Sequence, residues 1–442
     1  MPRLSLLAAA VILVAGCSRE QTYVCAGCNV VLVSIDTLRA DHVGAYGYPR
    51  PTTPNLDALA SSGVVFDNAV SQSSWTRPAH MSIMTGRYPN EIGFVGLNDR
   101  GRLEESCPTL ASTFKQNGYT TAAFTGGVNV GAGYGFDIGF DLFRSNGRTF
   151  RDNLEELRYW LDELATEPFF LFWHGYDAHT PYESDAIDRS ALGISRKPPR
   201  LGPERICSRS KAAGRIARLV DEYDAAVHRA DRYLGKLIAE LERRGVLERT
   251  VIVVVSDHGE EFREHGACFH LNTLYREVLH VPFVVHAPGL SARRVKDLVP
   301  GSVSVAKTIL DVVGASGSLP GSSLARALAG GGAPHEPVVS ETNHRLNVNG
   351  GRGHLRSLTS ENEKLIDWIT LERREWFDLA RDPNEHSPLQ AASGWKRARE
   401  QLSTWLVGHP TKHTAGDSAP SDEQRARNAE MERELRSLGY VE

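Results

Sequence analysis

One hydroxyl group of the chain stands where it could act as a nucleophile. Thr76 lies in the segment WTRPAHMSIMTGRYP (75–89), in which Pro78 suits the first turn of a helix and Thr85-Gly86 supplies a stop. Free backbone N–H groups at a helix N-terminus attract anions, so a phosphate or sulfate group could be held against the Thr76 oxygen. The competing interpretation is a threonine that only caps the helix.

Carboxylate and imidazole side chains follow two long apolar runs. Asp36 comes directly after NVVLVSI, and the triplet Asp257-His258-Gly259 comes directly after TVIVVVS. Such runs are typical of parallel strands buried on both faces, and open parallel sheets bind ligands at the carboxyl ends of their strands. A carboxylate beside an imidazole, followed by a glycine that lets the backbone turn, suits a divalent cation.

A third apolar run, FFLFW (169–173), is followed by His174, Asp177 and His179. Imidazole and carboxylate together after a buried strand indicate a second polar cluster at the same edge of the sheet. Among the later histidines, His270 is best placed to reach the site of Asp257.

The segments between these runs predict the elements that position them. Apolar spacing predicts helices near residues 55–61, 154–164 and 222–244, and strands near residues 64 and 120–127. This alternation predicts an α/β fold with a large, doubly wound, mostly parallel sheet flanked by helices. After a Gly/Ala/Ser-rich stretch at 314–332, shorter segments predict a small antiparallel sheet and a closing helix near 395–406.

Composition excludes several classes of protein. The 442 residues are 41% hydrophobic and 24% charged, which fits a globular chain with a large core. Lysine plus arginine number 50 against 54 acidic residues, a net charge of -4, so nucleic acid is not an expected partner.

The N-terminus predicts export and a lipid anchor. Arg3 precedes an apolar run from Leu4 to Ala15 that is too short to span a bilayer but suits a signal peptide. The run ends in LVAGC, which resembles the bacterial lipobox, in which the cysteine, here Cys17, is lipidated. We expect a lipoprotein facing the periplasm or the cell exterior; an ordinary signal peptide is the alternative. Cys25 and Cys28 are expected to form a local disulfide rather than a metal site.

Six blocks, taken in order, resemble the sulfatase family of the alkaline phosphatase superfamily. The resemblance runs from about Asn29 to Leu389, and the blocks read SIDTLRADHVGAYGY, SSWTRPAHMSIMTGRYP, HTPY, SDHGEEFREHG, LYREVLHVPFVVHAPG and KLI…EWFDLARDPNE. The resemblance implies an alkaline phosphatase-like fold and an ester hydrolase with a divalent metal ion, which could be Ca, Mn, Mg or Zn. It implies Asp36, Asp257 and His258 as metal ligands, Thr76 as a nucleophile that also approaches the metal, and His179 as a substrate-binding residue.

The chain departs from the usual family motif at the nucleophile. Sulfatases carry Cys or Ser in a C/S-x-P-S-R motif and convert it to formylglycine, whereas this chain has Thr76-Arg77-Pro78-Ala79-His80. Threonine cannot give formylglycine because its β-carbon carries a methyl group. The chain resembles superfamily members that have threonine at the nucleophile position. This resemblance favours phosphorus chemistry, whether on phosphodiesters, on phosphonates or in phosphotransfer, over the hydrolysis of sulfate esters.

The remaining roles stay open at this stage. His179, His80 and His270 are interchangeable candidates for contacting the substrate or protonating the leaving group, and Arg77 is a candidate substrate ligand. Asp177, His179 and His270 could supply a second metal site. Two alternatives remain, a sulfuric ester hydrolase without formylglycine and an inactive sulfatase-like lipoprotein that binds an anionic glycan; the oligomeric state is undetermined.

The expected organisation follows from these segments. Residues 1–17 are a lipoprotein signal peptide, 18–28 a linker, 29–315 a sulfatase-like catalytic domain, 316–410 a small C-terminal α+β subdomain, and 411–442 a polar tail.

Overall fold

A central mixed sheet carries the elements of the candidate site. The computed structural model describes residues 22–95, 101–164, 168–195, 213–345, 352–390 and 392–412. The strands of this sheet are β1 (Asn29–Ile35), β2 (Val64–Val70), β3 (Thr120–Phe124), β4 (Leu142–Arg144), β5 (Phe169–Gly175), β6 (Thr250–Val255), β9 (Phe283–His286) and β10 (Arg293–Pro300). Within the described residues their order is β10-β2-β9-β6-β1-β5-β3-β4. Only β9 runs antiparallel to its neighbours, so the predicted mostly parallel sheet is confirmed.

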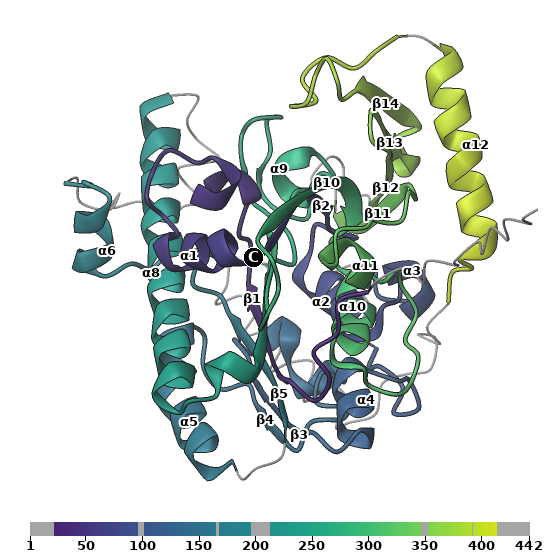
Figure 1. Ribbon diagram of the computed structural model, residues 1–442. Coiled ribbons are helices and arrows are strands. Elements are labelled where there is room, and N and C mark those ends of the chain that lie inside the picture. The colour runs from purple at the N-terminus through teal and green to yellow at the C-terminus, as the bar shows by residue number, and fades with distance from the viewer. Residues whose placement is uncertain are drawn as a thin grey trace, which may run out of the picture.

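Helices cover both faces of this sheet (Figure 1). One face carries α1 (Pro54–Ser62), α5 (Phe150–Glu163) and α8 (Ala213–Arg243), and the other carries α2 (Thr76–Thr85), α4 (Leu110–Gln116) and α10 (Val303–Val313). Successive side chains of a strand point to opposite faces of the sheet. Val31 and Val33 of β1 therefore join the core beneath α1, α5 and α8, and Val30 and Leu32 join the core beneath α2, α4 and α10. The middle of β1, residues 30–33, is therefore apolar on both faces.

The shorter elements connect these layers. They are α3 (Pro89–Ile92), α6 (Ala186–Ala191), α9 (Arg276–Leu279), α11 (Ala325–Leu328), the two-stranded pair β7 (Glu261–Phe262) and β8 (Cys268–Phe269), and the 3-10 helices η1 (Ala40–His42), η2 (Gly44–Tyr46), η3 (Val128–Val130), η4 (Ala132–Tyr134), η5 (Leu247–Arg249) and η6 (Ile369–Leu371).

Two helices begin earlier than their apolar spacing predicts. α5 begins at Phe150 because the Asp152 carboxylate accepts the Thr149 N–H at 2.8 Å, which satisfies a donor at the helix start. α8 begins at Ala213, nine residues before the predicted start, so it runs for 31 residues along the sheet.

A second, smaller sheet docks beside the nucleophile segment. β11 (Val338–Arg345), β12 (Arg352–Thr359), β13 (Glu363–Trp368) and β14 (Arg373–Asp378) form an antiparallel sheet in chain order, and α12 (Ala392–Gly408) packs on it. The predicted small sheet and closing helix are thus confirmed. Ser340 Oγ donates to the Ser71 carbonyl at 2.6 Å, and Glu341 N donates to the Gln72 carbonyl at 2.9 Å. β11 therefore lies along the loop that leads to Thr76.

The boundary region still belongs to the large core. Leu319, Leu324 and Leu328 pack with Ile309 and Leu310 of α10, so residues beyond 315 help to cover the first sheet before the second sheet begins at Val338.

Cys25 and Cys28 form the predicted local disulfide, and Cys268 is also disulfide-bonded. Among the described residues no helix is long and apolar enough to cross a membrane. The predicted signal peptide with Cys17, and the polar tail from residue 413, lie outside the described residues.

Candidate active site

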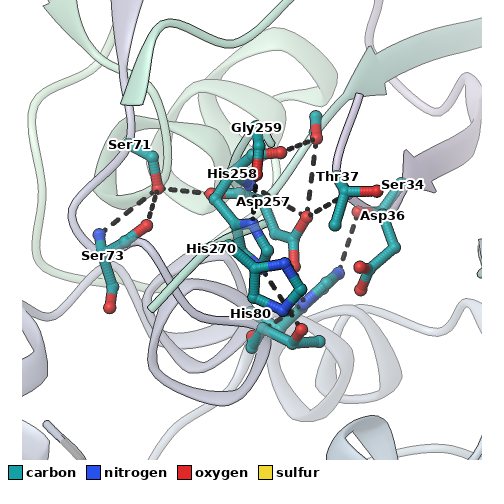
Figure 2. Close-up of polar contacts among 12 residues, drawn as sticks. Ser34, Asp36, Thr37, Ser71, Ser73, His80, Asp257, His258, Gly259 and His270 are labelled. Carbon is teal, nitrogen blue, oxygen red and sulfur yellow. Dashed lines mark hydrogen bonds and ion pairs between the residues drawn. The ribbon is translucent and has the colours of Figure 1, made fainter. Parts of the chain in front are cut away.

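The polar residues after the central strands meet at one edge of the large sheet. β6, β1 and β5 are adjacent, and Asp257, Asp36 and His174 lie at or just beyond their carboxyl ends. Figure 2 shows the side chains of Asp36, Asp257, His80, His258 and His270 gathered in this place.

Thr76 is the first residue of α2, and its hydroxyl does not cap that helix. The N-cap position belongs to Trp75, and no side-chain cap bond is formed. The Thr76 Oγ1 lies 3.3 Å from His258 Nε2. Because His258 Nδ1 bonds the Gly259 carbonyl at 2.9 Å, Nδ1 carries the ring proton and Nε2 presents a lone pair to the hydroxyl. The capping interpretation is therefore wrong, and Thr76 faces the site.

Two buried carboxylate oxygens at this point, Asp36 Oδ1 and Asp257 Oδ2, accept no hydrogen bond within the described structure. Asp257 Oδ2 lies 3.3 Å from ring nitrogens of both His80 and His258. One ligand atom each from Asp36, Asp257 and His258 lies within 4.8 Å of the others. Burying uncompensated carboxylates is costly, so this donor set fits a divalent cation bound between them.

The pKa values of Asp36 and Asp257 also fit a cation bound between them. Burial and the charge of Asp257 raise the pKa of Asp36 well above its ordinary value. Burial also opposes ionisation of Asp257, but the imidazoles of His258 and His80 outweigh it and lower the pKa of that carboxyl. Two carboxylates this close cannot both ionise easily without a cation between them.

His80 holds the start of α2 and does not face a substrate. Its Nδ1 bonds the Thr76 carbonyl at 2.9 Å and lies 3.3 Å from Asp257 Oδ2, and its Nε2 lies 2.8 Å from Ser34 Oγ. Both ring nitrogens are thus engaged by the protein. The predicted role of His80 in contacting substrate is corrected here, because the ring is a positioning group for Thr76 and Asp257.

His174 orients Asp36. Gly126 N donates to His174 Nδ1 at 3.1 Å, so the ring proton is on Nε2, which lies 3.1 Å from Asp36 Oδ2. The trio Asp36, His80 and His174 also has metal-binding spacing. However, the lone pairs of His80 and His174 are occupied by the Ser34 hydroxyl and the Gly126 N–H. That of His258 faces only one donor among the described residues, the Thr76 hydroxyl, so Asp36, Asp257 and His258 fit a cation better.

His179 and His270 flank the site from two other loops. Their ring centroids lie 5.0 Å apart, and the His270 ring lies 4.5 Å from that of His258. His179 Nδ1 bonds the Thr180 carbonyl at 2.5 Å, whereas His270 Nδ1 bonds Glu260 Oε1 at 2.7 Å. Both rings therefore direct their Nε2 atoms away from these anchors.

Their environments differ in charge. Burial and then the neighbouring His270 lower the pKa of His179 well below its ordinary value. His270 faces the Glu260 carboxylate, which also accepts the Tyr182 hydroxyl at 2.8 Å. Burial raises the pKa of Glu260 to about 8. Sequence reasoning leaves His179 and His270 interchangeable. In the structure His179 bonds the neutral Thr180 carbonyl, whereas His270 bonds the carboxyl group of Glu260.

Asp177 does not join this group. Its Oδ2 accepts the Phe150 N–H at 2.8 Å, and its Oδ1 lies 3.7 Å from Arg229 Nε. The Asp177 carboxylate is thus engaged by the first N–H of α5 and by the buried guanidinium of Arg229. The structure therefore does not support a second metal site built from Asp177, His179 and His270.

Arg77 lies between aromatic rings beside the nucleophile. Its guanidinium carbon is 3.5 Å from the Tyr134 ring centroid and 4.6 Å from that of Trp75. Arg77 Nη2 donates to Asn129 Oδ1 at 3.2 Å and to the Tyr134 hydroxyl at 2.5 Å. Because Arg77 can only donate, the Asn129 oxygen must face it, and the buried Asn129 Nδ2 finds no hydrogen-bond partner among the described residues.

Sequence reasoning missed the supporting residues of the site, namely Ser34, Gly126, Asn129 and Glu260. Ser34 could have been found, because it is a polar residue inside an apolar strand and lies two positions before Asp36, on the same face. Gly126 and Asn129 lie in the loop after β3, and no local pattern indicates which of its backbone and side-chain groups face the site.

The fold and this site define an ester hydrolase of the alkaline phosphatase superfamily. The sulfatase family model matches residues 28–315, and the chain belongs to the sulfatase family. It is 23% identical over 409 residues to the Delta 4,5-hexuronate-2-O-sulfatase of Bacteroides thetaiotaomicron, covering 82% of this chain and 84% of that protein.

Solved structures share the fold. A protein solved with its substrate D-glucosamine-2-N,6-O-disulfate superposes with a TM-score of 0.72 at 17% identity, covering 92% of this chain and 99% of that one. The phosphonate monoester hydrolase of Agrobacterium radiobacter gives a TM-score of 0.68 at 18% identity, covering 90% and 98%. The predicted alkaline phosphatase-like architecture is therefore confirmed.

Proposed function

We propose that this chain hydrolyses phosphoesters, with Thr76 as the covalent nucleophile in a metal-dependent site. The observation that carries the proposal is the Thr76 hydroxyl, which starts α2 and lies 3.3 Å from His258 Nε2. A threonine at this point can attack as an alkoxide but cannot supply the aldehyde hydrate of formylglycine. The phosphonate monoester hydrolase among the structural neighbours is consistent with phosphorus chemistry on this fold.

The cation would be held by Asp36, Asp257 and His258, with the Thr76 oxygen beside it. When bound, a divalent cation lowers the pKa of a neighbouring hydroxyl and shields the charge of an anionic ester. The chain's own contribution is to hold these groups rigidly, since His174 orients Asp36 and His80 orients Asp257 and the first turn of α2.

The reaction then proceeds in two displacements. Thr76 Oγ1, its proton lost to solvent, forms a bond to phosphorus while the bond to the leaving oxygen breaks, and that oxygen takes a proton. His270 is the better proton donor of the two flanking imidazoles, because its Nδ1 faces Glu260 whereas that of His179 faces a carbonyl. Water then cleaves the phosphothreonine and restores the hydroxyl. The buried Asn129 Nδ2 is available to bind a non-bridging oxygen, whereas His179 binds one only in its protonated form, because its neutral ring donates from Nδ1 to the Thr180 carbonyl.

One experiment tests both the nucleophile and the preference. Purified protein supplied with divalent metal is assayed on matched aryl esters, namely a sulfate, a phosphate monoester, a phosphodiester and a phosphonate. Turnover is also quenched in acid and the peptide containing Thr76 is analysed by mass spectrometry. We expect a phosphoester to be fastest and a phosphate on that peptide; faster hydrolysis of aryl sulfate than of every phosphoester would falsify the preference.

A sulfuric ester hydrolase without formylglycine is the second candidate. It is favoured by the Bacteroides relative, which is named a sulfatase and matches over most of both chains. The same panel separates the two candidates, because a sulfated Thr76 peptide and a fast aryl sulfate would support it.

A further inference from the structure

The guanidinium group of Arg148, which has no acidic partner among the described residues, lies beside the candidate active site. Arg148 Nη2 donates to the Thr180 carbonyl at 3.1 Å, and the same carbonyl accepts a bond from His179 Nδ1. The shared acceptor holds the guanidinium next to the His179 imidazole. Within the described part of the chain, no carboxylate lies at ion-pair distance from this guanidinium.

The backbone of Arg148 is fixed on both sides. Its carbonyl accepts the Tyr176 N–H at 3.0 Å, and its N–H donates to Asp152 Oδ2 at 3.0 Å. Arg148 is therefore clamped between the loop after β5 and the first turn of α5. A cation held in this way is positioned before any ligand arrives, which reduces the entropic cost of using it.

Neighbouring arginines pair with carboxylates, whereas Arg148 pairs with none in the part of the chain that the structure describes. Arg229 lies 3.3 Å from Glu183 and 3.7 Å from Asp177, and Arg151, one turn of helix along, lies 3.6 Å from Asp185. Arg148 as a whole is half-buried, so it is not enclosed in the core. Its remaining N–H donors have a planar, forked geometry that suits the two oxygens of a carboxylate or the oxygens of a sulfate or phosphate.

We infer that Arg148 binds a second anionic group of the substrate, apart from the ester group that Thr76 attacks. Preferred substrates are then esters whose leaving group itself carries a carboxylate, sulfate or phosphate. The inference rests on the proposed function, because it requires a substrate bound at Thr76. It adds Arg148, next to His179, as a residue that determines substrate specificity.

The test compares two substrates that differ in one charge. The metal-loaded full-length protein is assayed on 3- and 4-carboxyphenyl phosphate and on the neutral 3- and 4-carbamoylphenyl phosphates, and the ratio of kcat/KM, charged over neutral, is measured. We expect a ratio above one in the wild type. Arg148→Met should lower the ratio about tenfold, the size expected for one charge-assisted hydrogen bond at a partly exposed site, and Arg148→Lys should retain part of it.

Arg151→Met is the matched control, because it removes a nearby arginine that already has a carboxylate partner, and it should leave the ratio unchanged. Added NaCl should lower the wild-type ratio by screening. A wild-type ratio of one or less, or an equal loss for both substrates in Arg148→Met, overturns the inference.

Failure of the proposed function is distinguishable from this outcome. If only sulfate esters are turned over, the same ratio is measured with the corresponding aryl sulfates. If nothing is turned over, calorimetry with 4-carboxyphenylphosphonate and phenylphosphonate decides, because tighter binding of the former that depends on Arg148 supports the inference and equal binding contradicts it.

Discussion

At the scale of single residues, Thr76 is the point at which this chain departs from the Cys or Ser of the usual sulfatase motif. Thr76 keeps a hydroxyl at the start of α2, in contact with His258, while His80 fixes the carbonyl of the same residue. Thr76 is thus held through both its side chain and its backbone. A hydroxyl so constrained has little entropy to lose in reaching an in-line geometry, which favours its use as a nucleophile.

Removing the Thr76 hydroxyl should abolish catalysis while leaving the fold. Thr76→Val keeps the shape of the side chain but lacks the attacking oxygen, so turnover should fall at least about a thousandfold. Thr76→Ser keeps the oxygen and should retain measurable turnover. Steady-state kinetics are measured beside metal content and thermal melting. Wild-type turnover by Thr76→Val would show that another group attacks.

Asp36 and Asp257 should each be required for metal binding. Each has one buried oxygen that accepts no hydrogen bond from the described residues, so Asp36→Ala or Asp257→Ala should leave too few anionic ligands to hold a divalent ion. Metal stoichiometry of gently purified protein is measured by mass spectrometry, with melting curves as the test of folding. Asp177→Asn is the control, because its carboxylate faces Phe150 and Arg229, and its stoichiometry should match the wild type. A variant of Asp36 or Asp257 with unchanged metal content would remove that residue from the site.

The sequence predicts the residues at strand ends better than it predicts their individual roles. Asp36, Asp257 and His258 could be placed because an apolar strand ends just before each of them and the sheet brings those ends together. The roles of His80 and Asp177 could not, because they depend on which partner each polar atom finds across the fold. Ser34 and Phe150 are those partners, and they lie 46 and 27 residues away in the chain.

At the scale of elements, the small sheet is attached to the large one through buried polar contacts. Lys364 Nζ of β13 lies 2.8 and 2.9 Å from the two oxygens of Glu385, and Glu385 Oε2 also accepts the Arg276 N–H of α9. α9 in turn carries the Val278 carbonyl that accepts the Gly259 N–H. The small sheet thus supports the loop that presents Asp257 and His258.

The contacts of His265, which lies between the two sheets, should make the stability of the folded protein depend on pH. His265 Nδ1 lies 2.7 Å from Glu277, its Nε2 bonds the Glu385 carbonyl, and the ring stacks on Tyr275. Burial opposes its charge, but the bond to Glu277 prevails and raises the pKa of His265 to about 9. The folded state therefore binds more protons than the unfolded state between about pH 6.5 and 9. The stabilisation is complete below about pH 6.5 and is lost as pH rises through about 9.

Thermal melts from pH 6 to 10 check this expectation. The difference in melting temperature between wild type and His265→Gln should shrink as pH rises through about 9. His335→Gln is the control, because His335 also faces a glutamate, Glu361, but on the exposed surface, where such pairs contribute little. A constant difference between wild type and His265→Gln would exclude this role for His265.

Element boundaries and sheet edges were the least predictable parts of the fold. The central strands β1, β5 and β6 are buried on both faces, so apolar runs define them. The reversed direction of β9 and the fourth strand of the small sheet, β14, have no comparable local signal. β14 is partly exposed, and its place depends on pairing with β13.

At the scale of the whole molecule, the N-terminal segment bears on where the enzyme works. Tyr23 N already donates to the Ala325 carbonyl, and Cys25 N donates to the Val312 carbonyl, so the chain is attached to the large domain from about residue 23. Tyr23 is the sixth residue after Cys17. An extended chain of that length spans at most about 20 Å, so an anchor at Cys17 would hold the α10 and α11 side of the molecule close to a membrane.

We propose that Cys17 is lipidated and tethers the protein to a membrane facing the periplasm or the cell exterior. The motivation is LVAGC, which ends at Cys17 and follows a short apolar run. Cys17→Ala should move the protein from the membrane fraction to the soluble fraction and abolish incorporation of labelled palmitate. Cys107→Ala is the control, because Cys107 is a free cysteine of the folded domain whose loss should change neither result. Since the tether does not enter the site, solubilised wild type and Cys17→Ala should share the same kcat/KM on a soluble phosphoester. A Cys17→Ala protein that still sediments with membranes and still carries the lipid would exclude this cysteine as the anchor.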